Sequence, residues 1–231
     1  NRVEQSLADA TKAIELDPTS ALSFIIRGNA RLELEKYDAA VADYDKAIAL
    51  NDKDDLVYNN RGHLRNQKKD WNGALADFDK AIALAPRESR YVYQRAMARF
   101  ASHDHPGALA DLDRTIDLAP DNSDARLARA EIRLHNGNEA GAKEDVKAAE
   151  GALAPSSDKR LVVASLYDRL GAPDDALPNF DLWLKSHPED SSRGMALNGR
   201  CWVRGLLNRD LDKAMDDCNA ALRALGVRLS I

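Results

Sequence analysis

The sequence has 231 residues, with 33 lysines and arginines against 38 aspartates and glutamates, and a net charge of −5. A mixed, slightly acidic surface disfavours a nucleic-acid-binding protein, which typically presents a basic face. No run of about 18 apolar residues occurs in the sequence, so we expect no membrane-spanning helix.

A short segment recurs along the chain. It begins at Ala13, Ala47, Ala81 and Thr115, each 34 residues after the one before, and reads AIELDPTSA, AIALNDKDD, AIALAPRES and TIDLAPDNS. A fixed period of this length is typical of stacked helical hairpins. The sequence therefore predicts a single all-α solenoid domain over residues 1–231, in which each hairpin contacts only its neighbours.

The period sets the expected boundaries of the hairpins. We expect residues 1–20 to form the second helix of a truncated repeat. Four regular repeats are predicted at about 21–54, 55–88, 89–122 and 123–156, and two degenerate repeats at about 157–190 and 194–226. In the fifth repeat Pro178 lies inside the expected second helix, where a missing N–H should bend it, and Trp183 replaces an alanine.

Equivalent positions in successive repeats share side-chain size. One small column on the first helices reads Gly28, Gly62, Ala96, Ala130 and Ala164, and a second on the second helices reads Ala40, Ala74, Ala108, Ala142 and Ala176. A large side chain follows the second column in every repeat, at Tyr44, Phe78, Leu112, Val146 and Phe180. Small residues let paired helices approach and large ones fill the space beside them. We expect N-caps at Ser20, Asp54, Asn122 and Ser156 for the first helices, and mostly good caps at Lys36, Asp70, Asp104 and Asn138 for the second.

This pattern of small, aromatic and alanine positions, closed by prolines such as Pro86 and Pro120, resembles the tetratricopeptide repeat (TPR) family. The segment VYNNRGHLRNQKKDWNGALADFDKAIALAP, from Val57, is similar to the form common in bacterial members. The resemblance covers nearly the whole chain. It implies a right-handed superhelical solenoid whose first helices line a concave groove.

The resemblance also implies which residues face that groove, namely those just before and after the first small column. In this chain they are Ile25, Asn29, Leu32, Asn59, His63, Asn66, Tyr93, Met97, Phe100, Leu127, Glu131, Leu134 and Trp202. We expect them to bind a peptide, with an apolar patch at Tyr93, Met97 and Phe100 and backbone contacts from the neighbouring polar trio. The alternative is that these side chains only fill the inner wall of the superhelix.

Two charged series also follow the period. Arginine pairs four residues apart occur at Arg27/Arg31, Arg61/Arg65, Arg95/Arg99, Arg129/Arg133 and Arg200/Arg204. Aspartates keep step on the second helices, at Asp9, Asp43, Asp77, Asp111, Asp145 and Asp217. Matched opposite charges predict internal ion pairs that hold successive hairpins in register, with Arg61 contacting Asp43 or Asp77. The alternative is a cationic ladder for a phosphate or acidic ligand.

Signals for catalysis are weak. His103, Asp104 and His105 are adjacent, but no fourth ligand accompanies them at a recognised spacing. The sequence contains no Gly-rich phosphate loop and no pattern of nucleophile and base. We therefore expect no metal site, no cofactor and no catalytic residue, and a protein that is not an enzyme.

The two cysteines both lie in the sixth repeat. Cys201 replaces the small residue of the first helix and Cys218 replaces the large residue of the second. These positions pack within one hairpin, so the pair is a candidate disulfide, which requires Cα atoms within about 7 Å. A bridge would favour a periplasmic or exported protein, and two buried thiols a cytosolic one.

Together these patterns predict a non-catalytic protein–protein interaction module that binds a peptide or protein segment in its groove. The first alternative is an assembly module that forms a homo-oligomer through its degenerate C-terminal repeats or its apolar tail, VRLSI. A helical-repeat RNA binder is a more distant alternative, which the 34-residue period and the acidic balance oppose.

Overall fold

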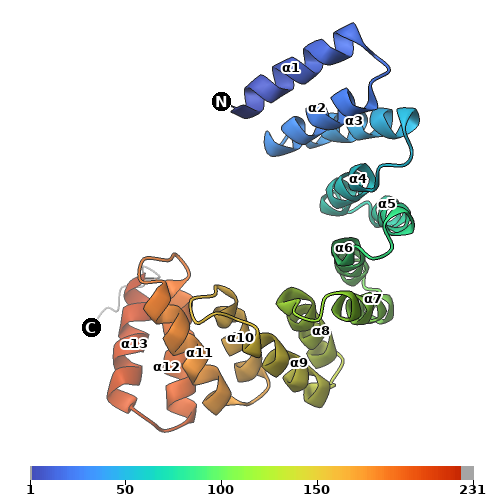
Figure 1. Cartoon of the computed structure of the whole chain (residues 1–231). Coiled ribbons are helices and arrows are strands. Elements are labelled where there is room, and N and C mark those ends of the chain that lie inside the picture. The colour runs from blue at the N-terminus through green and yellow to red at the C-terminus, as the bar shows by residue number, and fades with distance from the viewer. Residues whose placement is uncertain (1, 225–231) are drawn as a thin grey trace. The chain divides into compact units, whose positions relative to one another are not determined.

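The computed structural model describes residues 2–224, and within this range the chain forms thirteen α-helices and no β-strand (Figure 1). The prediction of an all-α helical repeat fold is therefore confirmed. The end of the predicted sixth repeat and the apolar tail, positions 225–231, lie outside the described residues.

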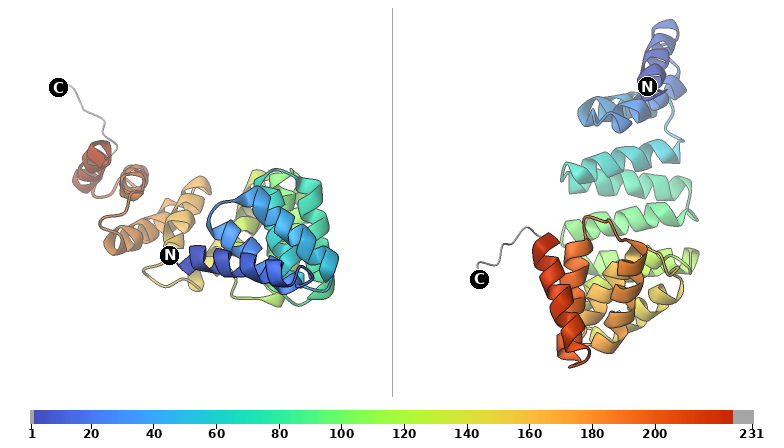
Figure 2. Two further views of the ribbon diagram at one scale, coloured as in Figure 1. Left: turned by 90° about the horizontal axis from the view of Figure 1, so that it is seen from above. Right: turned by 90° about the vertical axis from the view of Figure 1, so that its left-hand side faces the viewer.

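The helices form two compact units, Asn1–Pro120 and Asp121–Ile231. The helices of the first unit are α1 (Arg2–Leu16), α2 (Ala21–Glu33), α3 (Tyr37–Leu50), α4 (Asp55–Gln67), α5 (Trp71–Leu84), α6 (Ser89–Ala101) and α7 (His105–Leu118). Those of the second unit are α8 (Ser123–His135), α9 (Glu139–Gly151), α10 (Lys159–Arg169), α11 (Pro173–Ser186), α12 (Arg193–Leu206) and α13 (Leu211–Ala224). Within each unit, consecutive helices pack as hairpins of a first and a second helix (Figure 2). The assignment of all 231 residues to one solenoid domain stays a prediction.

The small and large columns form the core of the hairpins. Tyr44 and Phe78 are fully buried, as are the alanines four residues before them. Gly28 faces Tyr44 so closely that a Cβ atom on the glycine would lie 2.7 Å from Cε1 of the ring. The two helices approach closely and a large ring fills the space beside the contact, which explains why the side chains at these positions are small.

The predicted N-caps are mostly present. Side chains of Asp70, Asp104 and Asn138 accept hydrogen bonds from the backbone N–H three residues later, and Ser20, Asp54 and Asn122 do the same for the first helices. Ser156 is not a cap, because α10 begins only at Lys159. The Arg160 guanidinium holds the preceding turn by donating to the carbonyl oxygens of Leu153 and Ala154, at 2.7 and 3.1 Å.

The charged series form a buried ion-pair cluster inside each regular hairpin, which we call the Arg–Asp clasp. In the second repeat Arg61 donates from Nε and Nη2 to the two carboxylate oxygens of Asp77, at 2.9 and 2.5 Å. Arg65 adds a third bond of 2.9 Å from Nη1 to Oδ2 of Asp77. The predicted contact of Arg61 with Asp77 is confirmed, and the arginine pairs are used internally. The same clasp recurs at Asp43, Asp111, Asp145 and Asp217.

The clasp differs from the prediction in what it holds together. Its aspartate joins the two helices of one hairpin, and successive hairpins are linked by a second series of exposed aspartates two residues further on. Arg61 reaches Asp45 of the preceding hairpin at 2.6 Å, and Arg95 reaches Asp79 in the same way at 2.6 Å. Arg61 and Arg95 therefore each bind an aspartate of their own hairpin and one of the preceding hairpin, because a guanidinium group has several N–H donors in one plane.

The fifth repeat has a different polar network. Val163 and Tyr167 stand where the other repeats carry arginines, and Asn179 replaces the aspartate. Arg160 donates to Oδ1 of Asn179 at 2.7 Å, and Asn179 donates to Glu150 at 2.7 Å. Tyr167 also donates to Glu150, at 2.8 Å. This network replaces the clasp, and α11 runs as one helix with Pro178 inside it.

The sixth repeat restores the clasp and adds a covalent link. Arg200 pairs with Asp217 over a sequence separation of 17, one more than in the regular repeats, which matches the extra residue in this repeat. A disulfide joins Cys201 of α12 to Cys218 of α13, with Cα atoms 5.5 Å apart. The two helices of the last hairpin are therefore held by both an ion-pair cluster and a covalent bond.

Candidate functional site

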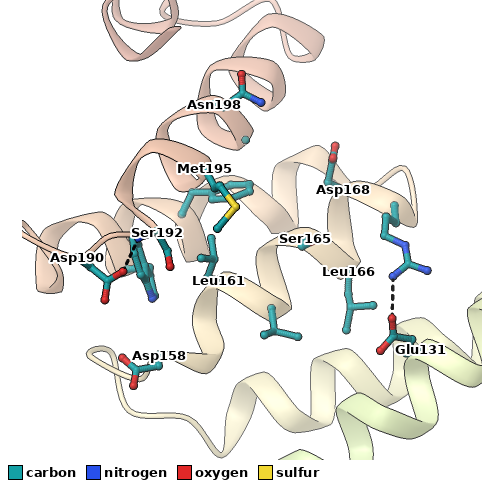
Figure 3. Close-up of a pocket in the computed structure, with 15 residues that line it drawn as sticks. Glu131, Asp158, Leu161, Ser165, Leu166, Asp168, Asp190, Ser192, Met195 and Asn198 are labelled. Atoms are coloured by element: carbon teal, nitrogen blue, oxygen red, sulfur yellow. Dashed lines mark hydrogen bonds and ion pairs between the residues drawn. The ribbon is translucent and has the colours of Figure 1, made fainter. Parts of the chain in front are cut away.

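The second unit contains an open pocket of about 540 Å³ on its first helices (Figure 3). It is lined by residues of α8, α10, α11 and α12 and of the two loops before α10 and α12: Glu131, Asp158, Leu161, Val162, Ser165, Leu166, Asp168, Arg169, Phe180, Trp183, Asp190, Ser192, Met195, Asn198 and Gly199. A pocket of this size accommodates several side chains of a bound segment.

The repeat register explains which side chains point into the pocket. The first helices α8, α10 and α12 contact one another in order. Leu161, Ser165 and Asp168 occupy in the fifth repeat the positions that Ile25, Asn29 and Leu32 occupy in the first. Offsets of four and seven residues place the three on one face of α10, so the pocket lies along this face.

The floor of the pocket is apolar. Leu166, Phe180 and Trp183 are buried beneath it, whereas Met195 is exposed at its wall. Gly199 lets α12 approach α11, because a Cβ at this position would lie 2.5 Å from Cζ of Phe180. The absence of a side chain at Gly199 thus keeps the ring at the base of the pocket.

Carboxylates surround the apolar floor. In Figure 3, Asp158 and Asp190 lie at one side of the pocket and Asp168 and Glu131 at the other, with Met195 between them. A single guanidinium, that of Arg169, lines the pocket, and it lies 3.5 Å from Glu131. The pocket therefore presents a negative field to a ligand.

Three of these carboxylates have polar partners inside the unit. Besides the pair of Glu131 with Arg169, Asp158 lies 2.6 Å from Nε2 of His187, and Asp190 accepts the backbone N–H of Ser192 at 2.6 Å. These contacts fix the positions of the carboxylates around the rim.

Asp168 differs from the other three because it is partly buried. Burial raises the pKa of its carboxyl group, and the nearby Trp202 side chain opposes this effect. Trp202 itself is 59% exposed on α12. An exposed indole therefore lies beside a partly desolvated carboxylate at this edge of the pocket.

His187 contacts two residues that line the pocket, Asp158 and Trp183. Its Nδ1 lies 2.9 Å from the carbonyl oxygen of Trp183, and its ring stacks on the Trp183 indole with centroids 4.6 Å apart. The hydrogen bond to the Trp183 carbonyl and the nearby Asp158 raise the pKa of His187. The protonated ring can donate from both nitrogens, which links the end of α11 to the loop before α10.

Comparison with known families and structures identifies the repeat. A family model described as "Tetratricopeptide repeat" matches residues 62–133, and a second, described as "TPR repeat", matches residues 28–66. Residues 28–133 of the chain are therefore tetratricopeptide repeats. No curated protein matches the sequence.

Several solved TPR structures are similar to this chain. PilW, a type IV pilus biogenesis factor, superposes with a TM-score of 0.70 at 20% identity, over 81% of this chain and 87% of PilW. PilF of Pseudomonas aeruginosa superposes with a TM-score of 0.68 at 18% identity, over 82% of this chain and 86% of PilF. YrrB, described as a TPR protein with an unusual peptide-binding site, superposes with a TM-score of 0.60 at 22% identity, over 78% of this chain and 93% of YrrB. At these identities the similarity establishes the TPR fold and nothing more specific.

The structure places the predicted groove residues of the first repeat in part-buried positions. Ile25 and Leu32 pack against the core of the first hairpin. The Asn29 oxygen accepts hydrogen bonds from Tyr44 and Asn60, at 2.8 and 3.2 Å, so it is already occupied.

The polar trio of the second repeat is less well satisfied. Oδ1 of Asn59 and Oδ1 of Asn66 are buried and have no hydrogen-bond partner among the described residues. His63 lies 3.1 Å from Gln67 through its Nε2. A buried carbonyl oxygen without a partner costs free energy, so these two amides remain candidates for contacts with a ligand or water.

In the third repeat, Tyr93, Met97 and Phe100 are all half-buried. The Phe100 ring lies 5.4 Å from that of His105, which belongs to α7. The apolar patch is thus partly covered by its own hairpin and partly accessible.

The predicted residues of the second unit divide into core and pocket. Leu127 is only 7% exposed and belongs to the core, and Leu134 packs against that core from a half-buried position. Glu131 lines the pocket and Trp202 lies beside it. For Leu127 the alternative of inner-wall packing describes the structure better, because its side chain has almost no exposed surface.

Of the residues that line the pocket, only Glu131 was among the predicted groove residues. Four of the others occupy the predicted groove positions in the fifth and sixth repeats: Leu161, Ser165, Asp168 and Asn198. The 34-residue register that predicts the groove residues of the regular repeats also points to these four positions. Pro178 and Trp183 mark the fifth repeat as degenerate, yet its first helix keeps the register.

The described part of the chain shows no helix long and apolar enough to cross a bilayer. Residues 2–224 also contain no group of three or more histidines, cysteines, aspartates or glutamates arranged to hold a metal ion.

Proposed function

We propose that this TPR chain is a non-catalytic protein–protein interaction module that binds a peptide segment of a partner on the face formed by its first helices. The observation that carries the proposal is the pocket of about 540 Å³ on α10 and α12, which follows the predicted groove positions into the fifth and sixth repeats. Its apolar floor and polar rim have the composition of a site for an extended segment with one buried anchor.

The first unit supplies a second surface for the same function. The half-buried trio Tyr93, Met97 and Phe100 provides apolar anchors, and Asn59 and Asn66 of the neighbouring first helix carry carbonyl oxygens without partners. The helices that hold the two sets, α4 and α6, contact one another. A peptide along this face would meet apolar and amide groups in alternation.

Peptide binding can be tested by selecting ligands from a random displayed peptide library on the wild-type chain and measuring their affinity for site variants. Met195→Glu alters the wall of the pocket, and Met215→Glu is its matched control, because both methionines are 61% exposed and Met215 lies on α13 outside the pocket. We expect Met195→Glu to abolish binding of the pocket ligands and Met215→Glu to leave it unchanged.

The first-unit surface needs a separate comparison. Phe100→Ala removes a half-buried ring, and Lys80→Ala is an exposed control on a second helix. Truncating a buried aromatic anchor commonly weakens binding by about 2 kcal/mol or more, whereas an exposed charge contributes little. Selected peptides that bind every one of these variants equally well would contradict binding on the first-helix face.

A second candidate function is assembly through the last hairpin, which one observation favours. Leu206 of α12 and Leu211 and Met215 of α13 are all exposed on this hairpin, and an exposed apolar patch on a folded protein marks an interaction site. Sedimentation equilibrium of the wild-type chain and of Leu211→Glu/Met215→Glu tests this function. A monomer at all concentrations would rule it out, and a dimer that the variant loses would support it.

A further inference from the structure

The edge of the pocket formed by α10 and α12 combines two groups that recognise cations. Trp202 exposes more than half of its surface, and its side chain lies near enough to Asp168 to lower the pKa of that carboxyl group. An indole that is 59% exposed offers its π face to a ligand. Indole faces and carboxylates both attract lysine and arginine side chains.

The charge of the whole pocket points the same way. Four carboxylates line it against one guanidinium, and that guanidinium, of Arg169, is already paired with Glu131. An acidic segment would be repelled by the excess of carboxylates, whereas a basic one would be attracted by them.

Asp168 is the rim carboxylate best placed to fix the position of a cation. As a residue it is half-buried, whereas Asp158, Asp190 and Glu131 are exposed. Burial, which raises the pKa of Asp168, also means that water screens its charge less. A cationic side chain beside it would therefore interact more strongly than one beside the exposed acids.

We propose that the pocket selects peptide segments in which a large apolar side chain is adjacent to a lysine or arginine. The apolar side chain lies on the floor between Leu161 and Met195, and the cation lies between Asp168 and the Trp202 ring. This inference rests on the proposed function and names the chemistry of the partner and the residues that determine specificity.

The experiment uses peptides selected on the wild-type chain and, for each, a synthetic copy in which the basic residue is replaced by norleucine or glutamine. Affinities are measured for the wild type, for Asp168→Asn, and for Asp216→Asn, an exposed control on α13. We expect Asp168→Asn to lower the affinity for the basic peptides about tenfold, because one charge-assisted contact is lost. The neutral copies should bind the wild type and Asp168→Asn equally, and Asp216→Asn should behave as the wild type.

The outcomes separate this inference from the proposed function. Two results would overturn the inference and leave the proposed peptide binding intact. One is that peptides without a basic residue lose affinity for Met195→Glu. The other is that Asp168→Asn lowers the affinity for basic and neutral peptides alike. A library that yields no ligand sensitive to Met195→Glu would overturn both. Should Asp168→Asn fail to fold by circular dichroism, Trp202→Ala makes the same comparison at an exposed position.

Discussion

Replacing Asp77 by asparagine removes the charge at the centre of one Arg–Asp clasp while keeping the shape of the side chain. The Asp77 carboxylate is 3% exposed and receives three hydrogen bonds from Arg61 and Arg65. An amide in its place accepts with one oxygen only and turns an N–H₂ group toward two guanidinium groups. The variant therefore leaves two part-buried cations without their main partner.

The size of the effect follows from the burial of the pair. Breaking a buried ion pair by removing one partner costs about 3–5 kcal/mol. We expect about 3 kcal/mol for Asp77→Asn, near the lower end, because Arg61 keeps its second partner, Asp45. Asp45→Asn is the matched control: it removes a partner of the same arginine, but one that is 51% exposed, so its cost should stay below about 1 kcal/mol.

The assay is equilibrium urea unfolding followed by circular dichroism, with both variants and the wild type under the same conditions. Native-state hydrogen exchange of the α4 and α5 amides reports whether the loss is local to the hairpin, as expected where each repeat contacts only its neighbours. Equal destabilisation by the two substitutions, or a loss below about 1 kcal/mol for Asp77→Asn, would refute the view that the buried clasp holds the hairpin together.

Three further outcomes are expected. Gly28→Ala should destabilise the chain by about 1–3 kcal/mol, because the new Cβ meets a buried ring at 2.7 Å, whereas Gly205→Ala, with open space around it, should be neutral or stabilising in the same urea assay. The double variant Cys201→Ala/Cys218→Ala should lose about 3 kcal/mol for a 17-residue separation, and its melting temperature should no longer respond to reductant, unlike that of the wild type. His187 should titrate above its ordinary value of 6.5 by NMR; because its folded pKa is raised, its contribution to stability should be complete at lower pH and lost as pH rises through that folded value, and a His187→Gln variant should lack this dependence.

The repeat architecture was readable from the sequence, because each hairpin is specified by residues close together in the chain. The period, the small column at Gly28 and the large column at Tyr44 predict which helices pair and which faces are buried. The clasp was partly predictable for the same reason: Arg61 and Asp77 are 16 residues apart, within one hairpin. Local pairing of this kind leaves a periodic trace in the sequence.

Other features of the structure depend on contacts that leave no periodic pattern in the sequence. The pocket requires residues of α8, α10, α11 and α12 to meet, and its floor at Phe180 exists because Gly199 lets α12 approach. The substitute network around Arg160 could not be foreseen, because its partners come from positions that are not repeated in the other hairpins. Periodicity thus determines the hairpins of this chain, and the departures from periodicity, resolved only by packing, determine where the pocket lies.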